Sequence, residues 1–194
     1  MTLAHHFLTM AYNNAWANHR LLKACAQLTA AEFAAPRTSF FPSIKATLNH
    51  NLTVDWKYID TLERSVQGRP PNPEPARFYD PPEPFDTCAP LAQEQRATDR
   101  RLIALCAGFD EAALDGPVQV PRATGVVYVD RVARIVAHLF EHQIHHRGQA
   151  HAMLAGTRIK PPQLDEFFCA DDAQLRAADF AELGFSEEAI WNRT

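Results

Sequence analysis

The chain contains 194 residues, enough for one ordinary domain with its own core, and we expect residues 1–194 to form a single domain. Its 46% hydrophobic and 22% charged residues are typical of a globular protein, and no run approaches the roughly 18 apolar residues of a membrane span. Nineteen basic and 23 acidic side chains give a formal net charge of −4, which argues against nucleic acid as a partner.

Apolar spacing predicts two long helices in the first third of the chain. From Leu3 to Leu28, apolar residues recur three and four positions apart, as on one face of a helix. Thr29 and Glu32 then form a capping-box pattern that opens a short turn. A second helical pattern follows Ser43 and continues as far as Arg64.

A proline-rich segment separates these helices from the rest of the chain. Residues 68–90, GRPPNPEPARFYDPPEPFDTCAP, contain eight prolines, which remove amide donors and bias the preceding residues away from helix. We interpret this segment as a long crossover connection within a helical bundle, not as a domain boundary. A third helix is predicted from Leu91 to Cys106.

The remaining chain predicts a small hairpin and a fourth long helix. Two short β-prone runs flank ATG in VQVPRATGVVYV, between Leu114 and Asp130. The fourth helix is expected from Asp130, as its N-cap, to Ala155, with Gly156 ending it. After Lys160 the best helical candidate is DAQLRAADFAELG. The predicted fold class is therefore all-α: a four-helix bundle with a long crossover and a small hairpin before the fourth helix.

Cysteine spacing and the N-terminal segment indicate a cytoplasmic protein. No two cysteines form a C-x-x-C pair, so neither a zinc ribbon nor a dithiol redox motif is available, and we expect reduced thiols. The N-terminal segment MTLAHHFLTMAYNN lacks the basic start and apolar core of a secretory signal. The four cysteines are Cys25, Cys88, Cys106 and Cys169.

Histidines crowd into the predicted fourth helix. Five of the nine lie in HLFEHQIHHRGQAHAML, residues 138–154. Because each residue of an α-helix turns by about 100°, His142 and His146 lie about 40° apart and one turn along, where they can share a metal ion. A metal also offsets the cost of burying unpaired imidazoles. His151 lies on the opposite face and is a poor ligand for this site.

A catalytic zinc site commonly takes three protein ligands, so a third histidine must come from another helix. His50 is the best candidate because apolar residues flank it at helical spacing in KATLNHNLTVDWKYIDTL, which predicts that it points near the bundle interior. The predicted metal ligands are therefore His50, His142 and His146. The weaker candidates lie near a chain end or among polar residues: His5, His6 and His19.

Two other histidine chemistries fit poorly. The H-E-x-x-H metalloprotease motif needs a glutamate directly after the first histidine, but Gln143 occupies that position and Glu141 projects about 100° away from His142. No cysteine sits at a recognisable nucleophile elbow beside these histidines. The residues that flank the predicted ligands, and are candidates for hydrogen bonding or proton transfer beside a metal, are His145, His138 and Gln149.

Three stretches in order, AYNNAWANHRLL, FFPSIKATLNHNLTVDWKYI and HLFEHQIHHRGQAHAML, resemble the DinB family of metalloenzymes, and the last is close to its H-x-x-x-H-R-G-Q signature. The resemblance implies a four-helix bundle with a long crossover. It also implies a metal held by one histidine of the second helix and two of the fourth, here His50, His142 and His146. It further implies zinc or nickel, a homodimer, and thiol-dependent transferase or isomerase relatives that use mycothiol, bacillithiol or glutathione.

The other residues of the three stretches are expected to support the fold or the metal ligands. Arg147 turns off the ligand face, and we expect it to pair with a carboxylate such as Asp55 or to contact a neighbouring helix. Gly148 costs a helix about 1 kcal/mol relative to alanine, so we expect it to permit close helix packing. Gln149 is expected to hydrogen-bond a metal-bound water or another group beside the metal. Trp16 is expected in the core.

The leading functional hypothesis is a divalent-metal enzyme that transfers a low-molecular-weight thiol to a small electrophile, with the metal stabilising a thiolate. One alternative is hydrolysis by a metal hydroxide, with His145 or His138 transferring protons. Another is a non-catalytic metal-binding stress-response protein whose site is closed by a fourth ligand. The expected partners are a small thiol, an electrophile and a second copy of the chain, without nucleic acid or membrane.

Overall fold

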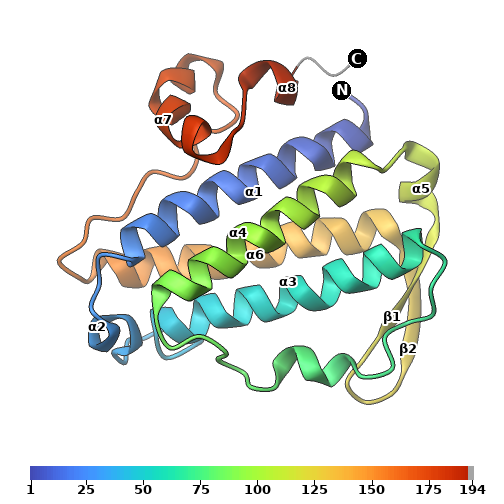
Figure 1. Cartoon of the computed structure of the whole chain (residues 1–194), viewed down its shortest axis with the longest axis horizontal. Helices are drawn as coiled ribbons and strands as arrows, with labels where there is room; N and C mark the ends of the chain where they lie inside the picture. Colours follow the sequence, from blue (N-terminus) through green and yellow to red (C-terminus); the bar gives the residue numbers. More distant parts are fainter. Residues whose placement is uncertain (192–194) are drawn as a thin grey trace.

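Four long helices form the bundle that the sequence predicts, in a computed structural model that describes residues 1–191 (Figure 1). Side-chain hydroxyls cap the N-termini of the first two long helices: Thr2 accepts from the amide of His5 at 3.1 Å, and Ser43 accepts from the amide of Ala46 at 3.0 Å. Such caps satisfy amides that have no partner inside a helix. The four helices are α1 (Leu3–Cys25), α3 (Ile44–Val66), α4 (Cys88–Ala107) and α6 (Val132–Ala155).

The proline-rich segment is a crossover, as predicted. Residues 67–87, with one 3-10 turn η1 (Pro75–Tyr79), return along the length of the bundle, so that α3 and α4 run in the same direction (Figure 1). Helix α1 packs beside α4 and α6, and α3 packs beside the same two helices. The pairs α1/α4 and α3/α6 therefore form two opposite sides of the bundle.

Helix boundaries differ from the predictions at three places. Helix α1 ends at Cys25, and the capping box of Thr29 and Glu32 begins a separate short helix, α2 (Ala30–Ala34). Helix α4 begins at Cys88, and its early proline lies in the first turn, where no amide donor is needed. The prediction of Asp130 as the N-cap of α6 is wrong, because strand pairing keeps the backbone extended as far as Arg131.

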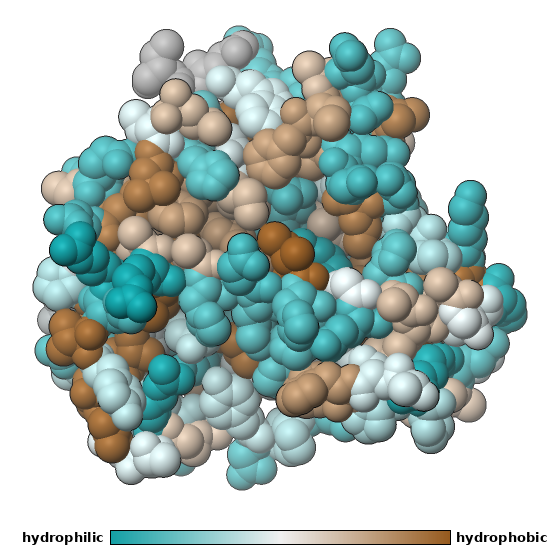
Figure 2. All heavy atoms as spheres, turned by 180° about the vertical axis from the view of Figure 1, so that it is seen from behind, coloured by the Kyte–Doolittle hydropathy of each residue, from teal (hydrophilic) through white to brown (hydrophobic). Residues whose placement is uncertain are grey.

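The predicted hairpin is present between α4 and α6. Strands β1 (Pro117–Pro121) and β2 (Val127–Arg131) pair antiparallel, and Gly125 in the turn has a φ of 81°. A short helix, α5 (Glu111–Asp115), precedes them and has too few residues for its periodicity to be recognised. Apolar atoms gather at the hairpin end of the molecule in Figure 2. The exposed residues there are Val126, Val127, Tyr128 and Val129.

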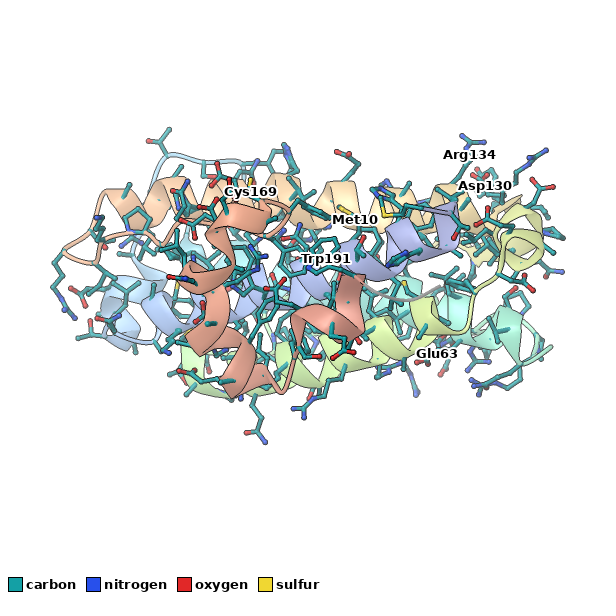
Figure 3. All side chains as sticks on the ribbon, turned by 90° about the horizontal axis from the view of Figure 1, so that it is seen from above. Met10, Glu63, Asp130, Arg134, Cys169 and Trp191 are labelled. Atoms are coloured by element: carbon teal, nitrogen blue, oxygen red, sulfur yellow. The ribbon has the colours of Figure 1, made fainter. Side chains whose placement is uncertain are left out.

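The C-terminal segment lies across α1 (Figure 3). It contains η2 (Ala170–Asp172), α7 (Ala173–Leu183), which matches the predicted tail helix, and α8 (Glu187–Trp191). Arg20 of α1 holds this segment through ion pairs with Asp179 at 2.6 Å and Glu166 at 3.0 Å.

Buried aromatic residues complete the core beneath this segment. Trp16 is fully buried with its ring 5.7 Å from that of Phe167, which confirms its predicted place in the core. All four cysteines are free thiols, as expected. No helix among residues 1–191 combines the length and apolar character that crossing a bilayer requires.

Candidate metal centre

The structure brings together the three histidines that the helical angles selected. His50 of α3 faces His142 and His146 of α6, and one nitrogen from each ring lies within 4.8 Å of the other two. The closest pair is Nε2 of His50 and Nε2 of His142, 3.1 Å apart. The antiparallel packing of α3 against α6 therefore joins residues 92 positions apart in the sequence.

The size and chemistry of this cluster fit a divalent metal ion. Zinc–nitrogen bonds of about 2.0–2.1 Å place tetrahedral ligand atoms about 3.3 Å from one another, close to the 3.1 Å between the Nε2 atoms of His50 and His142. Imidazole nitrogen suits zinc, nickel and other first-row metals. Among residues 1–191, no fourth histidine, cysteine or carboxylate joins the three. The cluster could therefore hold one ion on three protein ligands.

A hydrogen bond fixes the orientation of His146. Its Nδ1 donates to Oε1 of Gln149 at 2.8 Å, which leaves the lone pair on Nε2. The amide Nε2 of the same glutamine donates to Nε2 of His145 at 3.0 Å. Gln149 thus acts on the cluster through His146, a partner of the kind that commonly orients metal-binding imidazoles.

Burial keeps the three imidazoles neutral. Together with the smaller effects of the neighbouring His146 and His50, burial lowers the pKa of His142 to about 3. Burial, followed by the effect of His146, lowers the pKa of His50 to about 4, and burial also lowers that of His146. Near neutral pH the rings therefore carry free lone pairs, which a metal ligand requires.

An aromatic pair covers one side of the cluster. The ring of Phe41 lies 4.3 Å from that of His50 and 5.4 Å from that of His146, while Phe40 is 78% exposed and lies 6.3 Å from His146. Both residues belong to the loop before α3, where neither helical nor strand periodicity applies. The sequence therefore did not predict their place beside the histidines.

His138 and Lys57 lie on the side of His142 toward the start of α6. His138, one turn before His142, is exposed and its ring lies 6.1 Å from that of His142 and 5.2 Å from that of Tyr58. The ammonium of Lys57 lies 4.0 Å from the ring centre of Tyr58. Burial, with a smaller effect of Arg122, lowers the pKa of Lys57 to about 8. The sequence did not predict Lys57 here, because a lysine in a helix is usually solvated.

The remaining predicted candidates lie around the cluster, not in it. The exposed ring of His145 lies 4.8 Å from that of His146. His151 points away and its Nε2 donates to the carbonyl of Pro162 at 2.8 Å, as its opposite face predicts. Of the weaker candidates, His5 contacts the carbonyl of Ile190 and His19 contacts Glu182.

Behind the histidines, buried polar side chains from all four long helices form a hydrogen-bonded network, which we call the polar layer. Gln143 occupies the position of the metalloprotease glutamate, but it points into this layer: its Nε2 donates to Asp55 and its Oε1 accepts from Asn51 at 3.2 Å. Asp55 also accepts from Gln95 at 2.9 Å. The members are Asn14, Asn18, Asn51, Asp55, Gln95, Asp99, Gln143 and Arg147.

Arg147 joins α6 to α1 within the polar layer. Its guanidinium donates to Oδ1 of Asn14 at 2.6 Å and to Oδ1 of Asn18 at 3.0 Å. The predicted contact with a neighbouring helix is confirmed. The alternative of a direct pair with Asp55 is wrong, because Arg147 donates to the two asparagines and Asp55 accepts from Gln95 and Gln143. Burial raises the pKa of Asp55 to about 7, since it disfavours the charged carboxylate.

The prediction for Gly148 is also wrong. This residue is exposed, and a Cβ atom added to it would meet nothing within 4 Å. The reason is helical rotation: Arg147 points into the polar layer, so its neighbour about 100° further round faces solvent. Close helix packing does not explain this glycine.

Comparison with protein families agrees with the bundle and with the motifs that surround the cluster. The model described as the DinB family matches residues 2–177, which include all four long helices and the three histidines. Comparison with curated proteins finds no match. Since the family model spans most of the 194 residues, the chain belongs to the DinB family.

Proposed function

We propose that the chain is a divalent-metal-dependent transferase that joins a low-molecular-weight thiol to a small electrophile. His50, His142 and His146 would hold zinc or nickel. The observation that carries the proposal is the set of three neutral imidazoles without a fourth protein ligand among residues 1–191. Catalytic metal sites keep one position for water or substrate, whereas structural sites are closed by four protein ligands. When bound, the metal supplies the charge that keeps a thiol sulfur deprotonated.

The surrounding residues have roles in the same reaction. The sulfur forms a bond to the electrophilic carbon, the leaving group departs with its electron pair, and the thiol proton passes to a base. His145 can accept that proton on Nε2 once the hydrogen bond from Gln149 is released, because its exposed ring lies 4.8 Å from that of His146. Phe40 and Phe41 limit water on one side of the cluster. Beside His138, Lys57 favours an anionic group on either reactant.

Metal content tests the ligand set. We expect purified protein to carry about one metal ion per chain, and His50→Ala and His142→Ala to lose it, because two imidazoles bind far more weakly than three. His151→Ala is the matched control, since it removes a histidine from the far face of the same helix. Unchanged metal content in both ligand variants would rule out this site.

Thiol transfer is tested separately. Metal-loaded protein is incubated with bacillithiol, mycothiol, glutathione or cysteine and a panel of electrophiles, and formation of the C–S bond is followed by mass spectrometry. We expect acceleration with at least one thiol and its loss in His142→Ala. If the protein binds metal but accelerates none of these reactions, thiol transfer is wrong while the ligand set stands.

A metal-dependent hydrolase is the second candidate. The exposed ring of His145 favours it, because this ring lies 4.8 Å from that of His146 and can exchange protons with solvent. Turnover of ester or amide substrates in the absence of any thiol would support hydrolysis.

A homodimer remains part of the proposal, and sedimentation of the metal-loaded protein measures it. A protein that binds metal and shows neither activity would be a non-catalytic metal-binding protein.

A further inference from the structure

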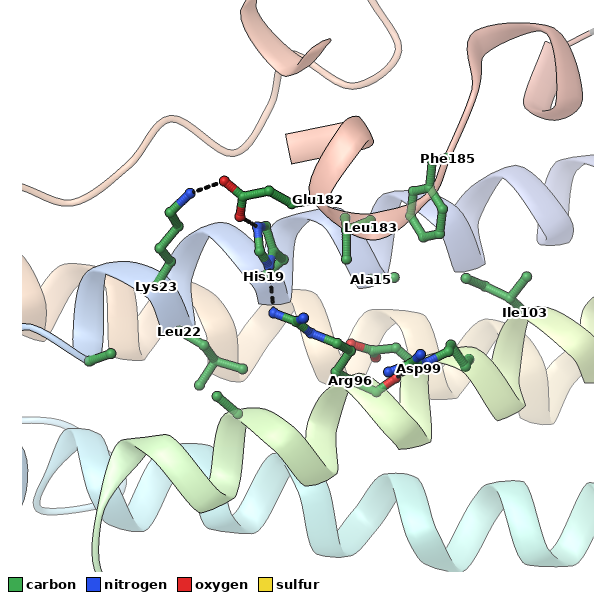
Figure 4. A pocket seen from close by; sticks show the side chains of 13 residues that line it. Ala15, His19, Leu22, Lys23, Arg96, Asp99, Ile103, Glu182, Leu183 and Phe185 are labelled. Carbon is green, nitrogen blue, oxygen red and sulfur yellow. Dashed lines mark hydrogen bonds and ion pairs between the residues drawn. The ribbon is translucent and has the colours of Figure 1, made fainter. Parts of the chain in front are cut away.

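A cavity of about 300 Å3 lies between α1, α4 and the end of α7 (Figure 4). Because the histidine cluster lies between α3 and α6, the cavity is on the opposite side of the bundle. Alanines leave this space open, since their side chains are too short to fill the groove between the two helices. They are Ala15, Ala26 and Ala92.

The remaining walls are largely apolar. Leu22 of α1 and Ile103 of α4 line the groove, and Leu183 and Phe185 cover it from the C-terminal segment (Figure 4). Phe185 is held in place by an edge-to-face contact with Tyr12, with ring centres 4.9 Å apart. The cavity therefore has walls that suit an apolar chain or ring.

Two guanidinium groups line the same cavity without a charge partner. They belong to Arg96 and Arg100. Both arginines are exposed, and neither has a carboxylate within 4.0 Å among residues 1–191. Lys23 differs, because it pairs with Glu182 at 2.6 Å. Arg96 and Arg100 are four residues apart on α4, so both project from one side of the helix. Their positive charge is therefore available to an anion at the mouth of the cavity.

His19 holds one of these groups in position. Its Nε2 donates to Glu182 at 3.0 Å, so its Nδ1 carries the lone pair that accepts from Arg96 at 3.3 Å (Figure 4). Burial and the charge of Arg96 lower the pKa of His19, which keeps the ring neutral. The guanidinium is thus oriented before any ligand arrives, which reduces the entropy lost on binding.

Asp99 sets the direction in which a ligand would lie. It lines the cavity from the polar layer, where its carboxylate accepts from Asn14 at 3.2 Å, Asn18 at 3.0 Å and Gln95 at 3.1 Å. A second carboxylate beside it would be repelled. Asp99 is buried whereas Arg96 and Arg100 are exposed, so an anionic group belongs at the solvent-facing guanidinium groups and the apolar part of the ligand belongs inside.

We propose that this cavity is a second binding site, for a small monocarboxylate with an apolar tail. The carboxylate contacts Arg96 and Arg100, and the tail lies among Leu22, Ile103 and Phe185. The site does not depend on the metal, and it stands whether or not the proposed transferase activity is correct.

Octanoate and its neutral analogue octanamide test the proposal. The full-length protein, with metal and after chelation, is titrated with each compound and followed by calorimetry and by amide chemical shifts. We expect saturable octanoate binding in both forms, with shifts at residues of α1, α4 and α7, and about tenfold weaker binding of octanamide. No saturable octanoate binding, or equal binding of both compounds, would overturn the proposal. So would binding that disappears with the metal, because the carboxylate would then be bound at the histidines.

Variants locate the site. The Arg96→Gln/Arg100→Gln double variant is expected to weaken octanoate binding about tenfold. Arg101→Gln is the matched control, because it removes a cation from the same helix that instead pairs with Glu63 at 2.9 Å. Ala26→Phe fills the mouth from an exposed position and is expected to abolish binding while circular dichroism is unchanged. Full binding by the double variant and by Ala26→Phe would place the carboxylate elsewhere.

Discussion

The histidine cluster and the polar layer share α6 but differ in how their polar atoms are paired. In the polar layer, most donors meet acceptors: Arg147 donates to two asparagine oxygens, and Asp99 accepts from side chains of α1 and α4, while one oxygen each of Asn51 and Asp55 has no partner among residues 1–191. In the cluster, ring nitrogens face one another, and Nδ1 of His142 is buried with no partner among residues 1–191. The first arrangement stabilises a bundle, whereas the second is a donor set suited to a cation.

The largest expected effect is the loss of Arg147. Arg147→Ala leaves Asn14 and Asn18 without their donor and removes the buried positive charge that faces two carboxyl groups. We expect the free energy of unfolding of the metal-free protein to fall by about 3–5 kcal/mol in urea titrations. Exposed Arg134→Ala on the same helix is the control, with an expected change below about 0.5 kcal/mol. Similar small losses in both variants would show that the polar layer contributes little to stability.

Asp55 should give the polar layer a distinct pH dependence. Its pKa is raised from 3.8 to about 7, so the folded protein keeps a proton that the unfolded chain has lost across this interval. Stability contributed by that proton is complete below about pH 4 and is lost as the pH rises to about 7, by up to about 4 kcal/mol. Asp55→Asn cannot titrate, and its Oδ1 can accept from the same glutamines.

The measurement is the difference in unfolding free energy between wild type and Asp55→Asn, both metal-free, across this pH range. Because both proteins contain the same histidines, histidine protonation cancels in the difference. We expect the variant to gain stability relative to wild type as the pH rises. A constant difference would mean that Asp55 is ionised in the folded protein throughout.

A smaller effect is expected at Gln149, which connects the cluster to His145. Gln149→Leu removes the acceptor that orients His146, and we expect metal affinity to fall about 10–100-fold, or about 1.4–2.7 kcal/mol. Competition with a chromogenic chelator measures this, and folding stability without metal should change little. If metal affinity is unchanged, the orientation of His146 depends on packing against Phe41 instead.

The smallest effect is expected at Gly148, where a substitution should change the stability of the helix without changing metal binding. Gly148→Ala adds a methyl group that meets no neighbour within 4 Å, so we expect the helix to gain up to about 1 kcal/mol in thermal or urea unfolding. Metal content should be unchanged, because Gly148 does not contact the cluster. Destabilisation by this change would show that the added methyl group meets another molecule, such as a second copy of the chain.

The histidine cluster was accessible from sequence because helical rotation is regular. Once α3 and α6 are recognised, the faces of His50, His142 and His146 follow from residue number alone. Asp130 shows the limit of such reasoning: it is a suitable N-cap residue, but strand pairing continues to Arg131, so the helix begins later. Local patterns cannot detect this competition.

Features that depend on distant parts of the chain were not predictable. Phe41 reaches the cluster from a loop, and Phe185 covers a groove formed by alanines more than 90 residues earlier. The polar layer was equally hidden: Asp55 and Gln143 are 88 positions apart, and each alone could have been a surface residue. Such groups acquire a partner only when the bundle is assembled.

The C-terminal segment across α1 makes the α1/α4 cavity separable from the histidine cluster. The family match ends at residue 177, whereas the residues that cover the α1/α4 cavity, Leu183 and Phe185, come later in the chain. The three histidines lie within the matched residues, and Leu183 and Phe185 lie outside them. Substitutions at Leu183 and Phe185 can therefore change what the cavity admits while the histidine cluster stays the same, because neither residue belongs to that cluster.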